Sequence, residues 1–512
     1  MNTPVQQQGI WKVIAASSVG TLIEWYDFYI FGSLATVIAD QFFPKGNPTA
    51  ALLATLATFA AGFIVRPFGA LVFGRLGDLI GRKYTFLLTL VLMGGSTFAI
   101  GLVPGYQTIG FAAPLIVLLL RLLQGLALGG EYGGAATYVA EHSPVNRRGY
   151  FTSWIQTTAT LGLLLSLGVI LLTRHSLDAD LQKSIAKFND WGWRIPFWVS
   201  IVLVGVSIYI RLKMQESPLF TKLKLECKTS KNPLKESFGN KANLKMVLLA
   251  LFGATMGQGV VWYTGQFYAQ SFIENVCKID FEQSRTILIW AIVAATPLFI
   301  VFGGWSDRIG RKWIMLSGML LAISSYHFIF KQLMNISDVK GKTEIVEQRK
   351  MLSREVMPVP DRPGEFAHIA ISEVHYTDGA VFKEVVTDTV KEDQSKTTKT
   401  IYKDKRLGSG DYWTAVWWLF VLVGYVTMVY GPIAAFLVEL FPTRIRYTSM
   451  SLPYHIGNGV FGGLTPFVAT LLTTIYVNDK LSGLWYSIVI AGACFIIGAV
   501  YVSNKIDPNV ND

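Results

Sequence analysis

Charged residues are scarce in this sequence of 512 residues. Asp, Glu, Lys and Arg together make up 15% of it, whereas a soluble globular domain has roughly a quarter. Apolar residues account for 52%. The few charges are concentrated in short gaps between long apolar runs. This composition excludes an ordinary soluble domain and indicates a protein that lies mostly in an apolar environment.

Cysteine is also rare, and the motifs of several enzyme classes are missing. The three cysteines, Cys227, Cys277 and Cys494, are odd in number and widely separated. They predict neither a disulfide framework nor a metal site. The sequence contains no nucleotide-binding Walker motif, hydrolase elbow or metalloprotease motif. We therefore expect no enzyme, no cofactor and no metal, and ATP-driven transport is disfavoured.

Long apolar runs are abundant, and each can cross a bilayer, which takes about 20 residues. In lipid every backbone polar group must be paired, so the runs predict helices. The fold class is therefore an all-α integral membrane protein with twelve spans in two six-helix halves. The predicted spans are 12–38, 50–74, 84–104, 112–140, 150–173, 192–212, 244–272, 284–305, 313–331, 412–440, 447–475 and 482–503.

Two charged motifs occur twice in the gaps. The first recurs 229 positions later and comprises Gly74, Asp78, Gly81, Arg82 and Lys83 in one copy and Gly303, Asp307, Gly310, Arg311 and Lys312 in the other. The second, Glu-x-x-Pro-x-x-x-Arg, runs from Glu141 to Arg148 and, 298 positions later, from Glu439 to Arg446. Repeats of this kind are typical of secondary transporters built from two related halves.

The unequal displacements locate an insertion in the second half. They differ by 69 residues, and the polar stretch 335–410 is the only candidate. We expect a first half at 1–212, a linker at 213–243, and a second half at 244–512 interrupted by the insertion. Alternating residues around Thr377-Asp378-Gly379 favour a β-hairpin, with a flexible loop as the alternative, and no function is assigned to it.

Basic residues predict the orientation in the membrane. Lys and Arg are concentrated in the gaps after spans 2, 4, 6, 8 and 10, and cytoplasmic loops carry this excess. Both termini are therefore expected in the cytoplasm and the insertion outside it. The net charge of +11 is interpreted as contact with the lipid bilayer, and it gives no support to nucleic-acid binding.

Several ionisable residues lie within the predicted spans of the first half. A charge at mid-bilayer costs at least about 2.5–3.5 kcal/mol, so these side chains are expected to face a cavity and to be functional. They predict a proton site, most directly at Glu24 or Asp27, and the alternative is a set of structural ion pairs. The candidate residues are Glu24, Asp27, Arg66, Arg121, Gln124 and Glu131.

Polar and aromatic residues dominate the spans of the second half. Gln258, Trp262 and Gln266 form one stripe at i, i+4 and i+8. Amide and phenol groups suit a small polar substrate, and Arg66 or Arg121 suits a carboxylate. The alternative interpretation is packing, which for a buried histidine is the more frequent role. The remaining candidates here are Tyr425, His455 and Asn458.

The repeated motifs predict a latch at the cytoplasmic ends of the helices. Asp78 and Asp307 can cap a helix or bind an arginine only when these ends are together, so the contact would stabilise an outward-open state. Glu141 with Arg148, and Glu439 with Arg446, are expected as partners in the same layer. The alternative is that these charges only set the topology.

The motifs together resemble those of a known family. The paired Gly-x-x-x-Asp-x-x-Gly-Arg-Lys loops resemble the signature of the major facilitator superfamily. Within this superfamily the chain resembles the metabolite:proton symporters. That subfamily includes carriers of proline/betaine, 2-oxoglutarate, citrate and shikimate. The motifs are Glu24-Trp25-Tyr26-Asp27-Phe28, Arg66-Pro67-Phe68-Gly69-Ala70, Arg121-Leu-Leu-Gln-Gly125 with Gly130-Glu131-Tyr132-Gly133-Gly134, and Glu439-Leu-Phe-Pro-Thr-Arg-Ile-Arg446 with Gly457-Asn458-Gly459.

The resemblance implies symport of a small organic acid or zwitterion with protons, by alternating access, in a bacterial inner membrane. It covers all twelve spans but does not name the substrate. The sequence departs from the family in its insertion and in Trp305-Ser306, which replace Leu76-Gly77 of the first copy. We expect a monomer whose partners are the substrate, protons and lipid. The alternatives are a uniporter and a transporter-like receptor without net transport.

Overall fold

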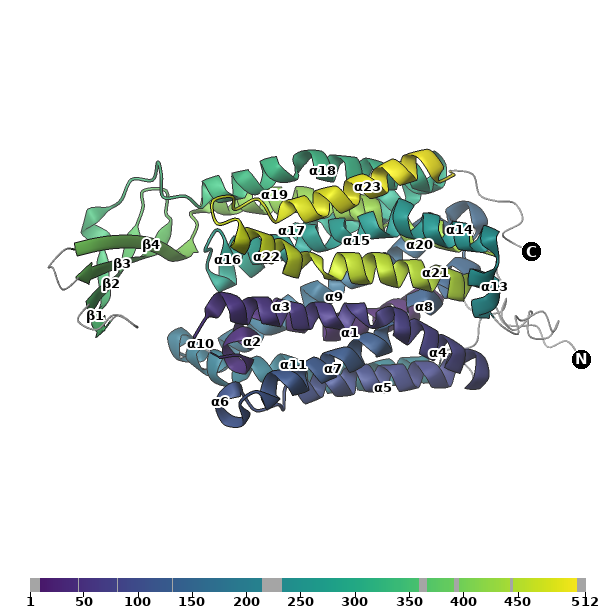
Figure 1. The fold of residues 1–512 in the computed structure, drawn as a ribbon, viewed down its shortest axis with the longest axis horizontal. Helices are drawn as coiled ribbons and strands as arrows, with labels where there is room; N and C mark the ends of the chain where they lie inside the picture. Colours follow the sequence, from purple (N-terminus) through teal and green to yellow (C-terminus); the bar gives the residue numbers. More distant parts are fainter. Residues whose placement is uncertain are drawn as a thin grey trace, which may run out of the picture. The chain divides into compact units, whose positions relative to one another are not determined.

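The computed structural model describes residues 10–44, 46–80, 82–130, 132–213, 233–358, 366–390, 396–442 and 445–503. Two compact units can be distinguished in it. The first comprises residues 1–267, 292–324 and 422–512, and the second comprises residues 268–291 and 325–421. The first unit consists of helices, and the second contains helix ends together with a four-stranded sheet (Figure 1).

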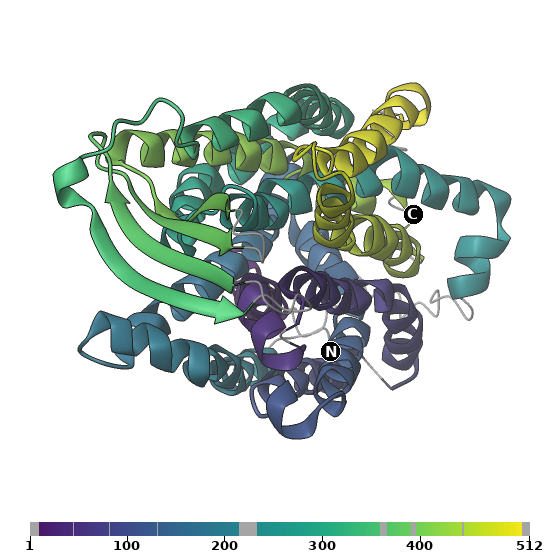
Figure 2. The ribbon, with the colours of Figure 1, turned by 60° about the vertical axis from the view of Figure 1, so that its left-hand side comes forward.

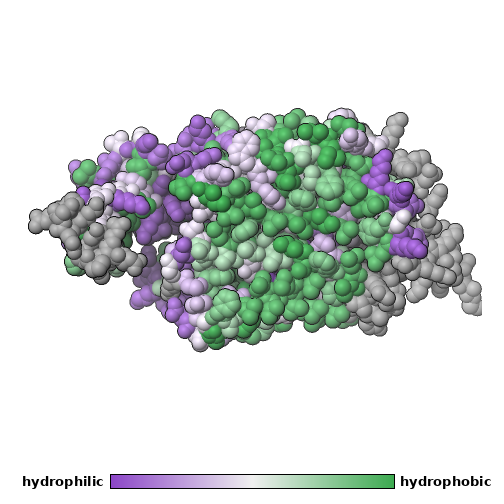
Figure 3. All heavy atoms as spheres, viewed as in Figure 1, coloured by the Kyte–Doolittle hydropathy of each residue, from purple (hydrophilic) through white to green (hydrophobic). Residues whose placement is uncertain are grey.

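The helices follow the predicted spans closely. Nine helices among the described residues are long and apolar enough to cross a membrane, a bent pair forms one more candidate, and two shorter apolar helices lie at Leu88–Ile100 and Ala112–Leu128. Each of these elements coincides with most of one of the twelve predicted runs, and several extend a few residues beyond it. Apolar side chains form a broad surface over the long helices (Figure 3). The predicted arrangement of twelve membrane helices is therefore confirmed.

The bounds of the helices are as follows. Those up to residue 213 are α1 Ile10–Ser33, α2 Ala35–Phe42, α3 Pro48–Ile64, α4 Arg66–Ile80, α5 Arg82–Ile100, α6 Tyr106–Ile109, α7 Ala112–Leu128, α8 Tyr132–His142, α9 Arg148–Ser176, α10 Leu181–Asp190 and α11 Ile195–Lys213. Those after it are α13 Pro233–Gly239, α14 Lys241–Ala250, α15 Met256–Tyr263, α16 Ala269–Asn275, α17 Phe281–Ile309, α18 Arg311–Ile336, α19 Ser409–Tyr430, α20 Ile433–Leu440, α21 Arg446–Tyr454, α22 Thr465–Ile475 and α23 Leu484–Tyr501.

Helix breaks lie where the sequence predicted polar sites. The second span divides into α3 and α4 between Ile64 and Arg66. Pro67 follows the break, and because proline has no N–H and clashes with the preceding turn, it is favoured in the first turn of a helix. Arg66 is thus the first residue of α4, at a bend within an apolar span.

The first and seventh spans are also irregular. The first bends by 61° between α1 and α2. The seventh contains two π-helical segments, Leu251–Thr255 and Thr264–Tyr268, on either side of α15. A third π-helical segment, His455–Gly462, follows α21. Such segments carry an extra residue per turn and are frequent at functional sites. Asn458 lies in the third segment, and Gln258 lies in α15 between the first two; the sequence had singled out both residues.

The second unit contains a single-layer antiparallel sheet. Its strands are β1 Lys350–Pro358, β2 Phe366–His375, β3 Val381–Val390 and β4 Lys396–Arg406, in the order β1-β2-β3-β4. The four strands lie side by side (Figures 1 and 2). The register of β2 on β3 runs from Phe366 opposite Val390 to His375 opposite Val381. The predicted hairpin is therefore confirmed, and Gly379 in its turn has a φ of 81°, which favours glycine.

Hydrogen bonds attach this sheet to the helix ends of the same unit. The amide of Lys405 donates to the Lys278 oxygen, and the Lys405 oxygen accepts from the amide of Asp280, both at 2.9 Å. The Gln283 side chain on α17 forms two hydrogen bonds with the backbone of Leu407, at 3.1 and 2.7 Å. Lys342 forms ion pairs with Asp378 and Asp411. The insertion is thus a folded element with several attachments.

Candidate functional site

Two buried arginines lie on either side of one aromatic ring. The guanidinium carbon of Arg66 is 4.3 Å from the centre of the Phe28 ring, and that of Arg121 is 4.0 Å from it. Both arginines are at most 1% exposed. Cation–π contacts of this kind stabilise a desolvated cation by about 2 kcal/mol or more, which is less than the full cost of its burial.

Arg121 is held by hydrogen bonds within the first six spans. One terminal nitrogen donates to Gln124 Oε1 at 2.6 Å and to the Phe28 oxygen at 3.3 Å. The other donates to the Phe59 oxygen at 3.3 Å. Gln124 in turn donates to the Thr97 hydroxyl at 2.6 Å. Arg121 and Gln124 therefore lie together, as predicted, in a network that ties α7 to α1, α3 and α5.

Arg66 is less well satisfied than Arg121. Within the described part of the chain, its Nε and Nη2 atoms have no hydrogen-bond partner. The Phe63 ring is 4.0 Å away and the Trp25 ring 5.4 Å away. The tyrosines that interact with its charge are Tyr263, Tyr29, Tyr454 and Tyr430. A buried cation with free N–H groups, surrounded by phenols, is suited to bind an anion.

A chain of polar side chains from the last six spans reaches the same tyrosines. Gln258 on α15 donates to Asn458 Oδ1 at 3.1 Å, and Asn458 donates to the Tyr454 hydroxyl at 3.2 Å. The Tyr454 and Tyr430 hydroxyls are 2.9 Å apart. Gly259 allows this arrangement, because an added Cβ would lie 2.5 Å from the Gly457 oxygen. We refer to Arg66, these four residues, Tyr29 and Tyr263 as the Arg66 site.

An aromatic column connects helices that are distant in sequence. Trp25 stacks on Tyr29 with ring centres 4.9 Å apart, and Tyr29 stacks on Trp262 at 5.2 Å. His455 is also buried near this site, where the charge of Arg66 acts on it and the Tyr454 ring lies 5.4 Å away. Trp262, His455, Gln258 and Asn458 are thus brought together with the predicted Arg66.

Both carboxylates of α1 are buried. Asp27 is 1% exposed, and neither of its oxygens has a hydrogen-bond partner among the described residues. The Ser200 hydroxyl on α11 is a polar neighbour of Asp27. Glu24 is 3% exposed and has polar contacts of its own. No described ion pair joins Asp27 to either arginine, and the expected grouping of acid and base stays a prediction.

Three other candidates lie elsewhere. Gln266 donates to the Thr160 hydroxyl on α9 at 3.3 Å. Tyr425 is half-buried, and its backbone oxygen lies 3.3 Å from the position of a Cβ added to Gly318 on α18, so it contributes to helix packing. Glu131 lies outside the described residues.

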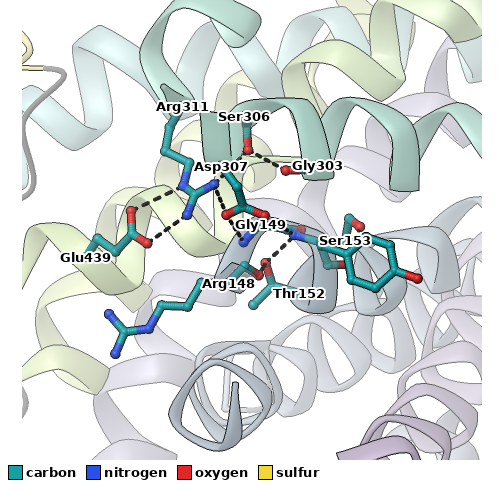
Figure 4. A network of polar contacts seen from close by, with 10 residues as sticks. Arg148, Gly149, Thr152, Ser153, Gly303, Ser306, Asp307, Arg311 and Glu439 are labelled. Carbon is teal, nitrogen blue, oxygen red and sulfur yellow. Dashed lines mark hydrogen bonds and ion pairs between the residues drawn. The ribbon is translucent and has the colours of Figure 1, made fainter. Parts of the chain in front are cut away.

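A second polar cluster is centred on Asp307 at the end of α17. One Asp307 oxygen accepts from the Gly149 amide at 2.8 Å and the other from the Tyr150 amide at 2.9 Å. These amides belong to the first turn of α9, whose unpaired N–H groups favour an anion. Figure 4 shows the Asp307 carboxylate facing this turn. Asp307 thus caps a helix of the first six spans, which lies 158 residues away in sequence.

Arg311 extends this cluster to α20. Its guanidinium forms an ion pair with Asp307 at 2.5 Å and a second with Glu439 at 2.9 Å. It also donates to the Ser306 hydroxyl at 2.9 Å. The bidentate contact with Glu439 is a strong and geometrically specific arrangement. We refer to Asp307, Arg311, Glu439 and the first turn of α9 as the Asp307 cluster.

Two glycines allow the helices to approach at this point. A Cβ added to Gly149 would collide with the Arg311 guanidinium and with the Gly303 oxygen, and one added to Gly303 would lie 2.5 Å from the Ser153 Cβ. Gly310 has a φ of 102° in the turn between α17 and α18. The repeated glycines of the second loop are therefore explained by close approach and by backbone conformation.

One of the two predicted pairs of this layer, Glu439 with Arg446, is replaced by other contacts. Arg446 contacts Glu141 at 3.4 Å, while Glu439 pairs with Arg311 instead of with Arg446. Burial lowers the pKa of Arg446 to about 10. The charge of Arg148 interacts with both Glu439 and Glu141, and Figure 4 shows its side chain extending away from Asp307.

The other basic residue of the second loop, Lys312, has a different role. It donates to the Ala499 and Val502 oxygens at 2.8 and 2.7 Å, which caps the end of α23. The structure does not describe the first copy of the motif in the same detail. Gly81 lies outside the described residues, and so do the side chains of Arg75, Asp78, Arg82 and Lys83.

Sequence reasoning did not assign Tyr29 or Gly149 to these sites. Tyrosines in apolar spans are common packing residues, and only the spacing of Trp25 and Tyr29 on one helix face hinted at the column. Gly149 follows Arg148 in a short loop, and nothing in the local sequence indicates that its amide binds a distant carboxylate.

Comparison with known proteins identifies the family. The model of a family described as "Sugar (and other) transporter" matches residues 12–247. The inner membrane metabolite transport protein YhjE of Escherichia coli is 31% identical over 479 residues, which cover 93% of this chain and 90% of that protein. The chain belongs to the metabolite transporters of the major facilitator superfamily. It is a multi-pass membrane transporter and not an enzyme.

Two further similarities agree with this assignment. The proline/betaine transporter of Escherichia coli is 35% identical over 333 residues, which cover 62% of this chain and 64% of that protein. The structure of the proton:xylose symporter XylE bound to 6-bromo-6-deoxy-D-glucose has a TM-score of 0.65 with 15% identity and covers 96% of each chain. The latter similarity shows the twelve-helix fold of the superfamily.

Proposed function

We propose that this major facilitator protein is a proton-coupled symporter of a small carboxylate-bearing metabolite, either an organic acid or a zwitterion. The observation that carries the proposal is the Arg66 guanidinium, which is buried, has two N–H groups without a described partner, and is surrounded by polar groups from both sets of six spans. An uncompensated buried cation is costly, and a substrate carboxylate removes this cost.

In this proposal the substrate carboxylate accepts hydrogen bonds from Arg66, and the phenols of Tyr263 and Tyr454 contact the rest of the molecule. The chain from Gln258 through Asn458 orients the Tyr454 hydroxyl. The site is contributed by α1 and α4 of the first six spans and by α15, α19, α21 and the π-helical segment His455–Gly462 of the last six. A substrate held there therefore contacts helices of both sets. This is the position at which alternating-access transporters bind their substrates.

Proton coupling is assigned to Asp27. A buried carboxylate without a cation beside it is buried at a lower cost when it carries a proton. Asp27 therefore accepts a proton while it is exposed to one side and releases it when the helices rearrange. The buried Asp27, separate from the Arg66 site, allows the proton and the substrate to be bound at the same time.

The Asp307 cluster is the proposed latch. It joins α9 of the first six spans to α17, α18 and α20 of the last six, and it forms only when these helix ends are in contact. In the topology that the basic loops predict, both termini and this cluster are cytoplasmic, and the sheet of the second unit is extracytoplasmic. We place the protein in a bacterial inner membrane, as a monomer with halves at 1–212 and 244–512.

Binding measurements on Arg66 variants test the substrate assignment. Purified protein is titrated with proline, betaine, 2-oxoglutarate and citrate, and the rise in melting temperature is recorded. Arg66→Gln is expected to abolish any shift that the wild type shows. Arg194→Gln is the control, because among the described residues Arg194 donates to the Gly101 and Val103 oxygens and not to a residue of the Arg66 site. A ligand that stabilises the wild type and Arg66→Gln equally would contradict the proposal.

A further inference from the structure

A groove lies between α14 and α23 on the surface of the first unit, apart from the Arg66 site. It has a volume of about 450 Å³, which falls within the range of about 300–1,000 Å³ that is typical of ligand sites. Most of its lining is apolar, and two lysines lie at one end. The lining residues are Lys241, Leu244, Lys245, Leu248, Leu249, Phe252, Ile497 and Tyr501.

The lining of the groove follows from helical periodicity. The six residues from α14 and its π-helical continuation are spaced at i, i+3, i+4, i+7, i+8 and i+11, which places them on one face of a helix. Ile497 and Tyr501, at i and i+4 of α23, form the opposite wall. Leu248 is 44% exposed and Phe252 is 37% exposed, so this face is not covered by another described helix.

The groove opens where the two helices diverge. Gly253 and Gly498 hold them together at its deeper end, because a Cβ added to Gly498 would lie 2.5 Å from the Gly253 oxygen. Gly253 belongs to the π-helical segment Leu251–Thr255. A π-helical turn changes the direction in which the following side chains project. On the far side of this turn, α14 separates from α23 and leaves the space between them open.

The depth of the groove in the membrane is set by its two helices. Both lie in candidate membrane spans, Lys241–Asn275 and Leu484–Tyr501. Lys241 and Lys245 are in the first turns of one span and Tyr501 ends the other, which are positions at the level of the lipid headgroups. Phe252 and Ile497 lie deeper, at the level of the acyl chains. Within the described residues, neither lysine forms an ion pair.

We propose that this groove is a binding site for an anionic phospholipid. One acyl chain lies along Leu244, Leu248 and Phe252, and the phosphate is bound by Lys241 and Lys245. Exposed lysines in pairs next to a membrane span attract anionic headgroups, and the apolar walls exclude a water-soluble ligand. A second copy of the chain is disfavoured, since pairing two such grooves would bring four lysines together.

Native mass spectrometry of the purified full chain tests the proposal. The protein is equilibrated with equal amounts of dioleoyl phosphatidylglycerol and dioleoyl phosphatidylcholine, and the lipids that remain bound are identified by mass. The wild type is expected to retain phosphatidylglycerol preferentially. The double variant Lys241→Ala/Lys245→Ala is expected to retain it about 30-fold less, which is the electrostatic contribution of two lysines near the headgroup.

Three further variants separate charge, shape and general surface effects. Lys241→Arg/Lys245→Arg keeps both charges and is expected to retain the lipid. Leu248→Trp fills the groove but leaves both lysines in place, and it is expected to lower retention as well. Lys183→Ala/Lys480→Ala removes two exposed lysines elsewhere and is expected to behave as the wild type.

Three results would overturn the proposal. The first is equal retention of phosphatidylglycerol by the wild type and by Lys241→Ala/Lys245→Ala. The second is equal retention of the two lipids by the wild type, which would show that the lysines do not select the headgroup. The third is a dimer that Leu248→Trp dissociates, which would show that a second copy of the chain covers the groove.

Discussion

Replacing Asp307 by asparagine should open the contact between α17 and α9. The substitution keeps the size of the side chain but removes its charge. Asparagine can still accept one of the two backbone hydrogen bonds that Asp307 accepts at 2.8 and 2.9 Å, while its amide N–H group opposes the other donor. The ion pair of Asp307 with Arg311 is also lost, although Arg311 keeps its contact with Glu439.

The magnitude of this effect follows from the contacts that are lost. A hydrogen bond to a charged group contributes about 1.5–3 kcal/mol, and an anion at a partly buried helix N-terminus contributes up to about 2 kcal/mol. Because part of each contribution survives in asparagine, we expect a loss of about 3 kcal/mol from the closed state. This corresponds to a shift on the order of 100-fold in the equilibrium between closed and open latch.

Distances between spin labels can measure this shift. The labels are placed at Val145 and Ile309, which are 51% and 55% exposed on opposite sides of the cluster, after the native cysteines have been replaced by serine. Asp307→Asn is expected to add a population with a longer distance. Asp190→Asn, at an exposed residue of α10, is the control and should leave the distribution unchanged. An unchanged distribution in Asp307→Asn would refute the role of the latch.

Three further predictions concern packing, reactivity and the inserted sheet. Gly149→Ala should lower the stability of the protein by about 1–3 kcal/mol, because the added methyl group overpacks the latch. Gly168→Ala is the control, since nothing lies within 4 Å of a Cβ added at Gly168. Melting temperatures measure the effect of both substitutions. Burial raises the pKa of Cys277 to about 12, so its thiol stays protonated and should react slowly with maleimide at pH 7.5; rapid labelling, detected by mass spectrometry, would be inconsistent with this. For Asp378, burial raises the pKa, but the hydrogen bonds from Lys342 and from the Ala380 amide, together with the charge of Lys342, outweigh it and leave the pKa below its usual value of 3.8. The stabilisation that Asp378 contributes is therefore present above that pH and lost as the pH falls below it. Lys342→Met removes the partner, so proteolysis of the sheet should become faster at neutral pH, and equal rates in variant and wild type would argue against this attachment.

Much of the fold could be predicted because lipid imposes a simple rule. An apolar run of about 20 residues must be a helix, and all twelve predicted runs contain one. The bend at Leu34 and the π-helical segments could not be predicted, since they depend on packing between helices. In the insertion, the turn at Thr377-Asp378-Gly379 indicated the central hairpin. The strands β1 and β4 were missed. For β4 the reason is its many lysines and threonines, which leave no apolar alternation to indicate a strand.

The candidate site was predicted in part for a similar physical reason. Arg66, Gln258 and Asn458 are polar groups in apolar spans, and burial in a membrane requires them to find partners. Sequence alone could not show that Tyr29 and Tyr263 join them, because the ring of a tyrosine in an apolar span can pack against many different neighbours. It also could not set the pairing of Glu439, which depends on how helices from the two repeats meet.

The central claim is that transport is driven by protons through Asp27. Uptake of labelled proline, betaine, 2-oxoglutarate and citrate into proteoliposomes, with and without an imposed pH gradient, tests it most directly. The wild type should accumulate one of these substrates above equilibrium only with the gradient. Asp27→Asn should still exchange that substrate across the membrane but should not accumulate it. Undiminished accumulation by Asp27→Asn would contradict the account.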